Sequence, residues 1–412
     1  MFMICFRVHH LLRNSGQSHG LSAGRFSMNV KRIGFATVSL CMCLISARPS
    51  IAFAESSAVD SALPGAGSLG QARVSGILLT RGEAVRIGDA YVSNFELERA
   101  ELGIQYSAGW LGARLRFETV RSAGTDSFIG IDQNSILPRI RFAYGEWTPF
   151  SGDVFNARLR MGVVPEPWVE SLEEIFDVRG LGPLASQQLG LFSPADLGVL
   201  GDFKLWQGMV HLQVGVLNGE GHSQIELNTG KNTIAVLSLR SPDINLWGPL
   251  RFSAHGGVRD GSVGIASVRD HRGMLAFAMT HPWLDIGSEF THAWGYQGRA
   301  KREAQSIGIW LRGQALSQWL GYAFRYDRFD VDVALGDTER DAFLGAIYTE
   351  LISSLSSSDT DRDRIRLYLG GEWARAGDRM GLLPGIPDAL SYTRIFLMME
   401  AVGGLSVPLL SK

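Results

Sequence analysis

Cysteine is nearly absent from this chain of 412 residues: it occurs three times, always within the first 43 positions. Residues 28–54 have the order of a secretory signal peptide, with two basic residues, an apolar run and a final Ala-Phe-Ala. We therefore expect residues 1–54, an N-terminal extension plus signal peptide, to be removed. An uncleaved anchor is the less favoured alternative, because Arg48 and Pro49 interrupt the apolar run. The secreted part then has no thiol, no disulfide and no cysteine metal site.

Long apolar runs and lysine are also scarce. No apolar run after residue 54 approaches the ~18 residues of a membrane-spanning helix, which excludes a helical membrane protein. All 41 acidic residues follow residue 54, but six of the 39 basic residues precede it, and the remaining 33 leave a net charge of −8. Only four of those 33 are lysine. Bulk electrostatic binding of nucleic acid is therefore not expected.

The sequence does contain alternation with a period of two. In residues 112–118, GARLRFE, small or apolar side chains alternate with charged ones, and the same pattern returns at 139–144, 157–161 and 364–369. Strict alternation over several residues predicts a β-strand with two different faces. After a flexible lead-in at 55–71, the pattern therefore predicts an all-β fold.

Turn-rich segments separate sixteen such stretches, and no linker divides them into two domains. Strands with longer loops at one end suit a transmembrane antiparallel β-barrel formed by residues 72–412. Strand boundaries read from alternation alone are not sharp, so fourteen or eighteen strands are alternatives to sixteen. The sixteen predicted strands are 72–80, 94–105, 110–121, 138–148, 155–164, 198–206, 208–217, 232–240, 249–259, 272–281, 283–296, 303–313, 317–329, 340–350, 363–375 and 391–402.

The aromatic residues favour a membrane barrel over a soluble β-sandwich, which alternates in the same way. The signal peptide directs the chain across the inner membrane, and the apolar positions are often small or mixed in size. A soluble secreted β-protein, with its tryptophans in an ordinary core, is the alternative. Barrels carry aromatic girdles at both rims. Five of the ten tryptophans fall near predicted strand ends: Trp110, Trp147, Trp206, Trp283 and Trp373.

The face that each strand turns to lipid follows from the cost of a buried charge. An arginine on the lipid side costs ~2–4 kcal/mol near the midplane. We therefore expect Ala113, Leu115 and Phe117 to face lipid, and the arginines that alternate with such residues to face a water-filled lumen. The predicted pore-lining residues are Arg114, Arg116, Arg139, Arg141, Arg158, Arg160, Arg364 and Arg366.

Three stretches resemble the phosphate-selective porin O and P family. FELERAELG at 95–103 is similar to its early strand motif, RMGVVPEPWVES at 160–171 to its strand entering a proline-containing turn, and the strand pair at 197–221 to its pair ending in Asn-Gly. The resemblance implies a sixteen-stranded outer-membrane barrel, usually a homotrimer, that conducts anions through a basic constriction. The sequence departs from that family in two ways. It has Glu166 in the turn where relatives often carry Lys-x-Pro-Phe, and Lys204 is the only lysine on a predicted strand that could correspond to the lysine such channels use at the constriction.

The longest connection, residues 164–197, is rich in acidic side chains. In porins a loop at this position folds into the lumen, where its acids would oppose the strand arginines and favour small polar solutes with weak ion selectivity. If the loop stays outside, the arginines dominate and anions are favoured. Simple solvation of these carboxylates is an equal alternative to a constriction. The acidic residues of this predicted constriction loop are Glu166, Glu170, Glu173, Glu174 and Asp177.

No pattern indicates catalysis, a metal or a cofactor. The histidines after residue 54 lack metal-ligand spacing, G-x-S-x-G is absent, and Glu173-Glu174 has no positioned partner. We therefore expect a non-enzymatic porin in the Gram-negative outer membrane, in contact with outer-membrane lipid and without a cofactor or metal. It would be a passive diffusion channel for small polar or anionic solutes. The alternative is a barrel-based enzyme or adhesin that acts through its loops.

Overall fold

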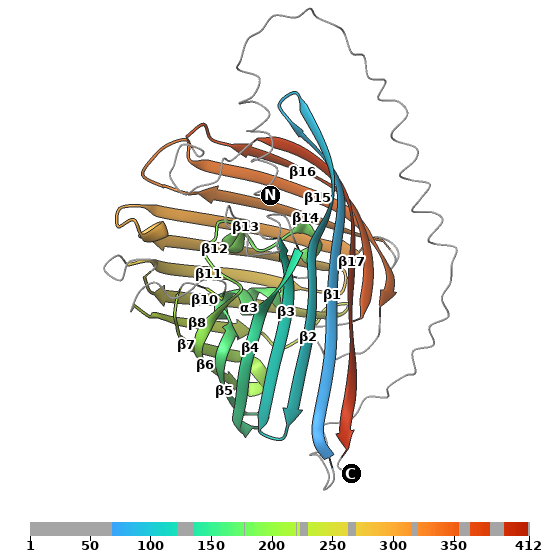
Figure 1. Cartoon of the computed structure of the whole chain (residues 1–412), viewed down its shortest axis with the longest axis vertical. Helices are drawn as coiled ribbons and strands as arrows, with labels where there is room; N and C mark the ends of the chain where they lie inside the picture. The colour runs from blue at the N-terminus through green and yellow to red at the C-terminus, as the bar shows by residue number, and fades with distance from the viewer. Residues whose placement is uncertain are drawn as a thin grey trace, which may run out of the picture. The chain divides into compact units, whose positions relative to one another are not determined.

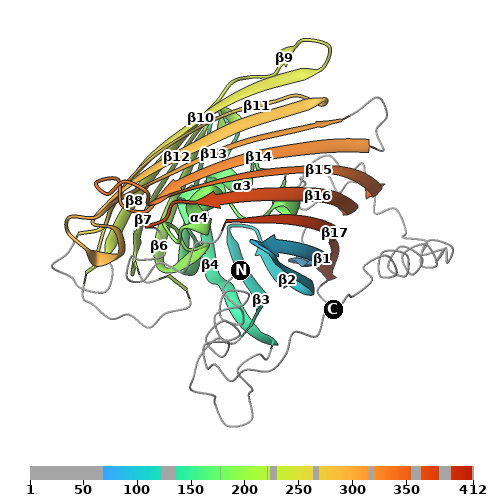
Figure 2. The same ribbon diagram turned by 90° about the horizontal axis from the view of Figure 1, so that it is seen from above.

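The described part of the chain forms a closed antiparallel β-barrel of sixteen strands (Figure 1 and Figure 2). The predicted extension and signal peptide lie outside the described residues, and so does most of the predicted lead-in, although the first strand begins at Ser68. The computed structural model describes residues 68–121, 136–176, 178–219, 221–222, 230–262, 269–314, 320–353, 363–379 and 391–410.

Each strand pairs with its neighbours along the chain, and β1 pairs with β17 to close the sheet. The two-residue β9 pairs only with the start of β10, while β8 and β10 are direct neighbours in the wall. The strands are β1 (Ser68–Ile87), β2 (Ala90–Ala108), β3 (Leu111–Arg121), β4 (Ile136–Ser151), β5 (Phe155–Pro165), β6 (Ala195–Leu205), β7 (Val210–Leu217), β8 (Asn232–Arg240), β9 (Ile244–Asn245), β10 (Pro249–Asp260), β11 (His271–Thr280), β12 (Leu284–Trp294), β13 (Glu303–Gln314), β14 (Leu320–Asp330), β15 (Glu339–Ser353), β16 (Arg364–Ala376) and β17 (Tyr392–Leu410).

All sixteen predicted strands are confirmed, and the predicted range of β8 agrees with the structure at both ends. Two strands run well beyond their predicted ends: β17 continues to Leu410 instead of residue 402, and β1 continues to Ile87 although the sequence pattern predicts an end at residue 80. Arg81 and Glu83 interrupt the apolar pattern there, but the two side chains pair with each other at 2.9 Å inside the barrel. An internal ion pair therefore lets the strand continue where hydrophobic periodicity alone does not.

The two ends of the barrel differ in the length of their connections. At one end, called the short-loop end, two to four residues join β2 to β3, β4 to β5, β6 to β7 and β11 to β12. At the other end, the long-loop end, residues 166–194 join β5 to β6 and residues 218–231 join β7 to β8.

No helix in the described ranges is long and apolar enough to cross a membrane.

The outer surface of the barrel is apolar, with aromatic residues near both rims. On β5, Leu159 and Met161 are 41% and 69% exposed, whereas Arg160 between them is 1% exposed. The predicted girdle residues are exposed, but two other tryptophans, Trp168 and Trp310, are buried inside the barrel. The outer tryptophans at the short-loop end are Trp110, Trp147, Trp206, Trp247 and Trp283, and those at the long-loop end are Trp294 and Trp373.

Leu159→Arg tests the assignment of the outer face, because Leu159 lies near the middle of β5. We expect the substitution to lower the free energy of unfolding by ~2–4 kcal/mol, the cost of an arginine at the bilayer midplane. Urea unfolding in lipid vesicles, followed by tryptophan fluorescence, measures this difference.

The matched control is Val258→Arg, because Val258 is exposed only two residues before the end of β10. Near the interface the expected cost is only ~0–1 kcal/mol. Equal effects at the two positions would show that the outer face does not lie in lipid at these depths.

One β-bulge changes the predicted alternation on β4. The register between β3 and β4 shifts at Arg116 and Phe117, which pair with Phe142 and Ile140. Strict alternation from Arg139 and Arg141 would turn Phe142 outward, but its side chain is buried, with three guanidinium groups 5.3–5.8 Å from the ring centre. The bulge therefore places an aromatic ring among the arginines of the inner wall.

The connection between β5 and β6 lies inside the barrel (Figure 1 and Figure 2). It contains α3 (Pro167–Glu173), the short helical turn η2 (Arg179–Leu181) and α4 (Ala185–Gln188). Helix α3 contacts β7 and β8, η2 contacts β17, and α4 contacts β12, β13 and β14. The structure therefore decides between the two arrangements that the sequence left open, in favour of the inward one. We call residues 166–194 the inner loop.

Candidate functional site

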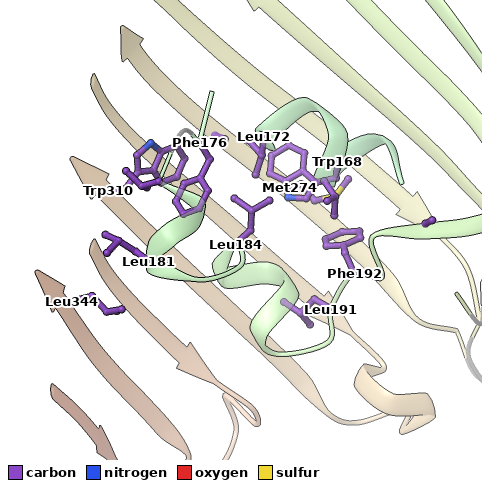
Figure 3. Close-up of a cluster of buried hydrophobic side chains, with 14 of the residues drawn as sticks. Trp168, Leu172, Phe176, Leu181, Leu184, Leu191, Phe192, Met274, Trp310 and Leu344 are labelled. Atoms are coloured by element: carbon purple, nitrogen blue, oxygen red, sulfur yellow. The ribbon is translucent and has the colours of Figure 1, made fainter. Parts of the chain in front are cut away.

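Apolar side chains hold the inner loop against the wall. Figure 3 shows Trp168, Leu172 and Phe176 of the loop facing Met274 and Trp310 of the strands. The rings of Phe176 and Trp310 meet edge to face with centroids 5.1 Å apart. Such a pair adds ~0.5–1.5 kcal/mol to the stabilisation that burial gives. A hydrophobic core therefore lies inside this barrel, between the loop and the wall.

Polar contacts fix the far part of the inner loop. The buried carboxylate of Glu289 on β12 accepts hydrogen bonds from the backbone N–H of Ala185 at 2.7 Å and from the Ser186 hydroxyl at 2.8 Å. Gln188 donates to Asp327 on β14 at 2.9 Å. Because these acceptors belong to the rigid wall, they hold α4 at one position across the lumen.

The inner wall of β2, β3 and β4 carries a dense group of guanidinium groups. Arg141 donates to Glu101 at 2.9 Å and to Glu118 at 3.2 Å, and its other terminal nitrogen reaches Glu173 of the inner loop at 3.4 Å. Glu173 also accepts a hydrogen bond from Arg179 at 3.1 Å. We call this group the arginine cluster: Arg99, Arg114, Arg116, Arg139, Arg141 and Arg179 with Glu101, Glu118 and Glu173.

The arginine cluster has an excess of positive charge. Among the described residues it combines six guanidinium groups with three carboxylates, so the formal charge of the cluster as defined is +3. His222, from the connection between β7 and β8, lies 3.0 Å from Glu118. The four predicted pore-lining arginines of β3 and β4 are therefore brought together, and one loop acid, Glu173, meets them directly.

The predicted arginines on β5 belong to a neighbouring group with the opposite balance. Arg160 binds both oxygens of Glu170, at 2.8 and 2.9 Å, and also Asp202 at 2.9 Å. Arg158 shares Asp202 at 3.0 Å and reaches Glu146 at 3.4 Å. Three carboxylates here meet two guanidinium groups, so these two arginines bind the loop to the wall and do not form an open positive surface.

The predicted arginines on β16 form separate pairs. Arg364 donates to Glu400 on β17 at 3.0 Å, and Arg366 donates to Glu350 on β15 at 2.8 Å. The hydroxyl of Tyr368 donates to the second oxygen of Glu400 at 2.7 Å. The structure therefore does not bring Arg364 and Arg366 into the arginine cluster, and their charges are balanced locally.

The acidic residues of the inner loop occupy different environments. Glu170 and Glu173 meet the wall arginines, Glu174 binds Arg240 near the short-loop end of β8, and Glu166 is buried at the start of α3. Asp177 lies outside the described residues. Two of the five predicted acids are thus placed opposite the predicted arginines.

Ion pairing keeps the loop carboxylates charged. Burial would raise the pKa of Glu170, but the Arg160 guanidinium outweighs burial and lowers that pKa to about 2. Burial likewise opposes ionisation of Glu173, and Arg179 and Arg141 together lower its pKa. Both carboxylates therefore stay ionised at neutral pH.

Sequence analysis did not identify Arg99, Glu101 or Glu289. Glu101 lies opposite Glu118 only through the register of β2 and β3, and two like charges in register are not a recognisable motif. Glu289 is an acidic residue at an inward position of β12, and this is the one signal that the sequence offered. The described residues contain no group of three or more His, Cys, Asp or Glu side chains that could hold a metal ion.

Comparisons with known proteins support the architecture. No protein-family model and no curated protein sequence matches the chain. Among solved structures, the chain is similar to an anion-selective porin from Comamonas acidovorans, with a TM-score of 0.53 and 12% identity over 81% of this chain and 99% of that one. It is also similar to OmpF of Salmonella typhi in complex with daunomycin, with a TM-score of 0.53 and 9% identity over 80% and 97% of the two chains.

A third similar structure is OmpT of Vibrio cholerae, expressed in the outer membrane, with a TM-score of 0.52 and 10% identity over 81% and 98% of the two chains. The chain therefore has the fold of outer-membrane porins. Its closed backbone and apolar outer surface place it in the Gram-negative outer membrane. By the usual rule for such barrels, the short-loop end faces the periplasm and the long-loop end the exterior.

Proposed function

We propose that this protein is a passive diffusion channel for small polar and anionic solutes, with the inner loop as its constriction. The observation that carries the proposal is the contact between the loop acid Glu173 and the arginine cluster of β2, β3 and β4. Fixed charges of both signs at a narrow passage orient polar solutes and replace part of the hydration shell of ions. The excess of arginine in the cluster favours anions over cations of similar size.

The ion selectivity of the channel is expected to be modest. Carboxylates pair with many of the inner-wall arginines, including all four that were predicted on β5 and β16. Paired charges attract mobile ions weakly, because each neutralises the field of the other within a few ångströms. The proposed anion preference therefore depends on the arginine cluster and not on the total number of arginines.

The double substitution Arg114→Gln with Arg139→Gln tests this proposal. It reduces the excess of positive charge in the arginine cluster from three to one without introducing a buried like-charge pair. We expect the reversal potential in a salt gradient to move toward that of an unselective pore, with little change in unitary conductance. Planar-bilayer recording measures both quantities.

The matched control is Arg328→Gln, because Arg328 lies on the outer face of β14, on the same side as the exposed Phe324. This control removes an arginine from the same barrel and should leave the reversal potential unchanged. An unchanged reversal potential in the double variant would show that the arginine cluster does not line the conduction path.

Phosphate selectivity and a homotrimer are the finer parts of the proposal, and they rest on the family resemblance of residues 95–103, 160–171 and 197–221. Phosphate should then reduce chloride conductance at concentrations at which sulfate does not. Native mass spectrometry should show three copies in the detergent-extracted protein. Equal effects of phosphate and sulfate would limit the proposal to a general anion channel.

A further inference from the structure

The imidazole ring of His222 lies against the arginine cluster, at a point where three parts of the chain meet. His222 belongs to the connection between β7 and β8, but its side chain is only 2% exposed. One ring nitrogen, Nε2, is 3.0 Å from Oε1 of Glu118 on β3. The other, Nδ1, is 3.1 Å from the hydroxyl of Ser193 in the inner loop. The ring therefore joins the wall, the inner loop and the connection after β7.

This position suits both the neutral and the protonated ring. The backbone N–H of His222 donates to the carbonyl of Ala195 at 3.0 Å, which fixes the main chain beside the ring. A neutral ring can donate from Nε2 to Glu118 while Nδ1 accepts from Ser193. A protonated ring can donate from both nitrogens, because a serine hydroxyl accepts as readily as it donates. Protonation therefore adds a charge here without requiring the connection to move.

The ring shares its carboxylate with two arginines of the cluster. Oε1 of Glu118 faces His222 and also accepts from Nε of Arg139 at 3.0 Å. Oε2 of the same carboxylate accepts from Arg141 at 3.2 Å. When His222 is protonated, one carboxylate has three cations to balance instead of two. The side chain of Arg139 is 36% exposed, whereas that of Arg141 is 6% exposed, so Arg139 is the one of these two arginines that is open to water.

We propose that His222 adjusts the anion preference of the channel to pH, by adding a positive charge to the arginine cluster when its ring is protonated. The inference rests on the proposed channel and names a residue that determines its selectivity. Histidine is the type of side chain that ordinarily changes its charge between pH 5 and 8, and this is the range to examine. Because protonation adds positive charge, the preference for anions should rise as the pH falls.

Other charged groups near the ring do not differ between the proteins to be compared. Glu220 is adjacent in sequence, lies outside the described residues and is present in every variant. Burial raises the pKa of Glu166, at the start of α3, to about 7, so Glu166 also titrates in this range. A substitution at position 222 leaves both residues unchanged. The charged groups on the elements around His222 are Glu118 on β3, Arg139 and Arg141 on β4, Asp196 on β6, and Arg259 on β10, which borders the same cavity as Ser193 and Gly221.

Reversal potentials of the full-length protein in planar bilayers under a salt gradient, recorded at pH 8 and pH 5.5, test the proposal. Ordinary carboxylates stay ionised at both pH values. The anion-to-cation permeability ratio of the parent protein should be at least about twofold higher at pH 5.5, because one charge several ångströms from a passing ion changes its local concentration by about that factor in water. An unchanged ratio in the parent protein would overturn the proposal without any variant.

His222→Gln should remove most of this rise. Glutamine can still donate to Glu118 and accept from Ser193, but it carries no charge at either pH. His222→Lys provides a second variant with the opposite expectation. Its charge is present at both pH values, so the higher permeability ratio should already be seen at pH 8. Heat-modifiable migration on gels shows which of the two variants is folded.

His292→Gln is the matched control and should keep the full rise. His292 pairs with Glu303 at 3.1 Å and lies on the outer face of β12, on the same side as the exposed Phe290. A rise in His222→Gln equal to that of the parent protein would overturn the proposal and leave the proposed channel intact. A preference for cations at both pH values would instead contradict the proposed function, so the two failures are distinguishable.

Discussion

Replacement of residues 167–193 by a short glycine-serine linker should raise the single-channel conductance several-fold without opening the barrel wall. The inner loop crosses the lumen from β5 and reaches β8, β13 and β17, so its removal should widen the proposed passage. A short linker can join the remaining ends, because the backbone N–H of Glu166 already donates to the carbonyl of Pro194 at 3.2 Å. Sixteen-stranded barrels without an obstruction enclose an aqueous channel.

The barrel itself should survive this deletion, since its closure depends on backbone hydrogen bonds between strands and not on the loop. Retained heat-modifiable migration on gels provides the control for folding. Insertions of the variant into planar bilayers should show larger current steps and weaker ion selectivity. Current steps of unchanged size from a folded variant would contradict the assignment of residues 166–194 as the constriction.

Arg160→Met should destabilise the folded protein by ~3–5 kcal/mol, the effect of removing one partner from a buried ion pair. Arg160 is 1% exposed and satisfies both Glu170 of the inner loop and Asp202 of β6. Methionine keeps much of the volume, but it leaves two carboxylates close together without their shared cation. Guanidinium unfolding of the detergent-solubilised protein at neutral pH measures the loss.

This loss should depend on pH with a definite sign. The pKa of Glu170 in the folded protein, about 2, lies below its ordinary value of 4.5. The pair therefore contributes its full stabilisation above pH 4.5, and that contribution disappears as the pH falls toward 2. The difference between the parent protein and Arg160→Met should accordingly shrink in acid.

Arg251→Met is the matched control for that measurement. Arg251 and Asp243 form an ion pair that is about half exposed on both sides, and such a surface pair contributes only ~0–1 kcal/mol. If Arg160→Met were no more destabilising than this control, the buried ion pairs would not be what holds α3 to the wall.

The sequence predicted the barrel well because a strand with lipid on one side and water on the other must alternate strictly. The predicted strand ends and faces were wrong where an ion pair or a β-bulge interrupts strict alternation. The end of β1 continues through the internal pair of Arg81 and Glu83, and a bulge turns Phe142 inward. The bulge is visible only from the register of the neighbouring strand, and the ion pair only from the fact that both side chains of β1 face the interior.

The candidate site was predictable in its residue types but not in its pairing. The loop acids and wall arginines could be named from alternation, yet the pairing of Glu170 with Arg160 and of Glu173 with Arg141 depends on the path of the loop. That path is set by contacts between residues distant in the chain, such as Phe176 with Trp310. The arginines and carboxylates of the barrel could form ion pairs in many combinations. The sequence therefore could not show which arginines lie in the group with more guanidinium groups than carboxylates.

Single-channel recording of the unaltered protein in a planar bilayer under a salt gradient tests the central claim most directly. A channel narrowed by the inner loop and dominated by the arginine cluster should open in discrete steps, with a reversal potential that shows a modest preference for anions. A preference for cations would contradict the dominance of the arginine cluster. Folded protein that inserts but conducts no current would contradict the channel itself and favour a barrel that acts through its loops.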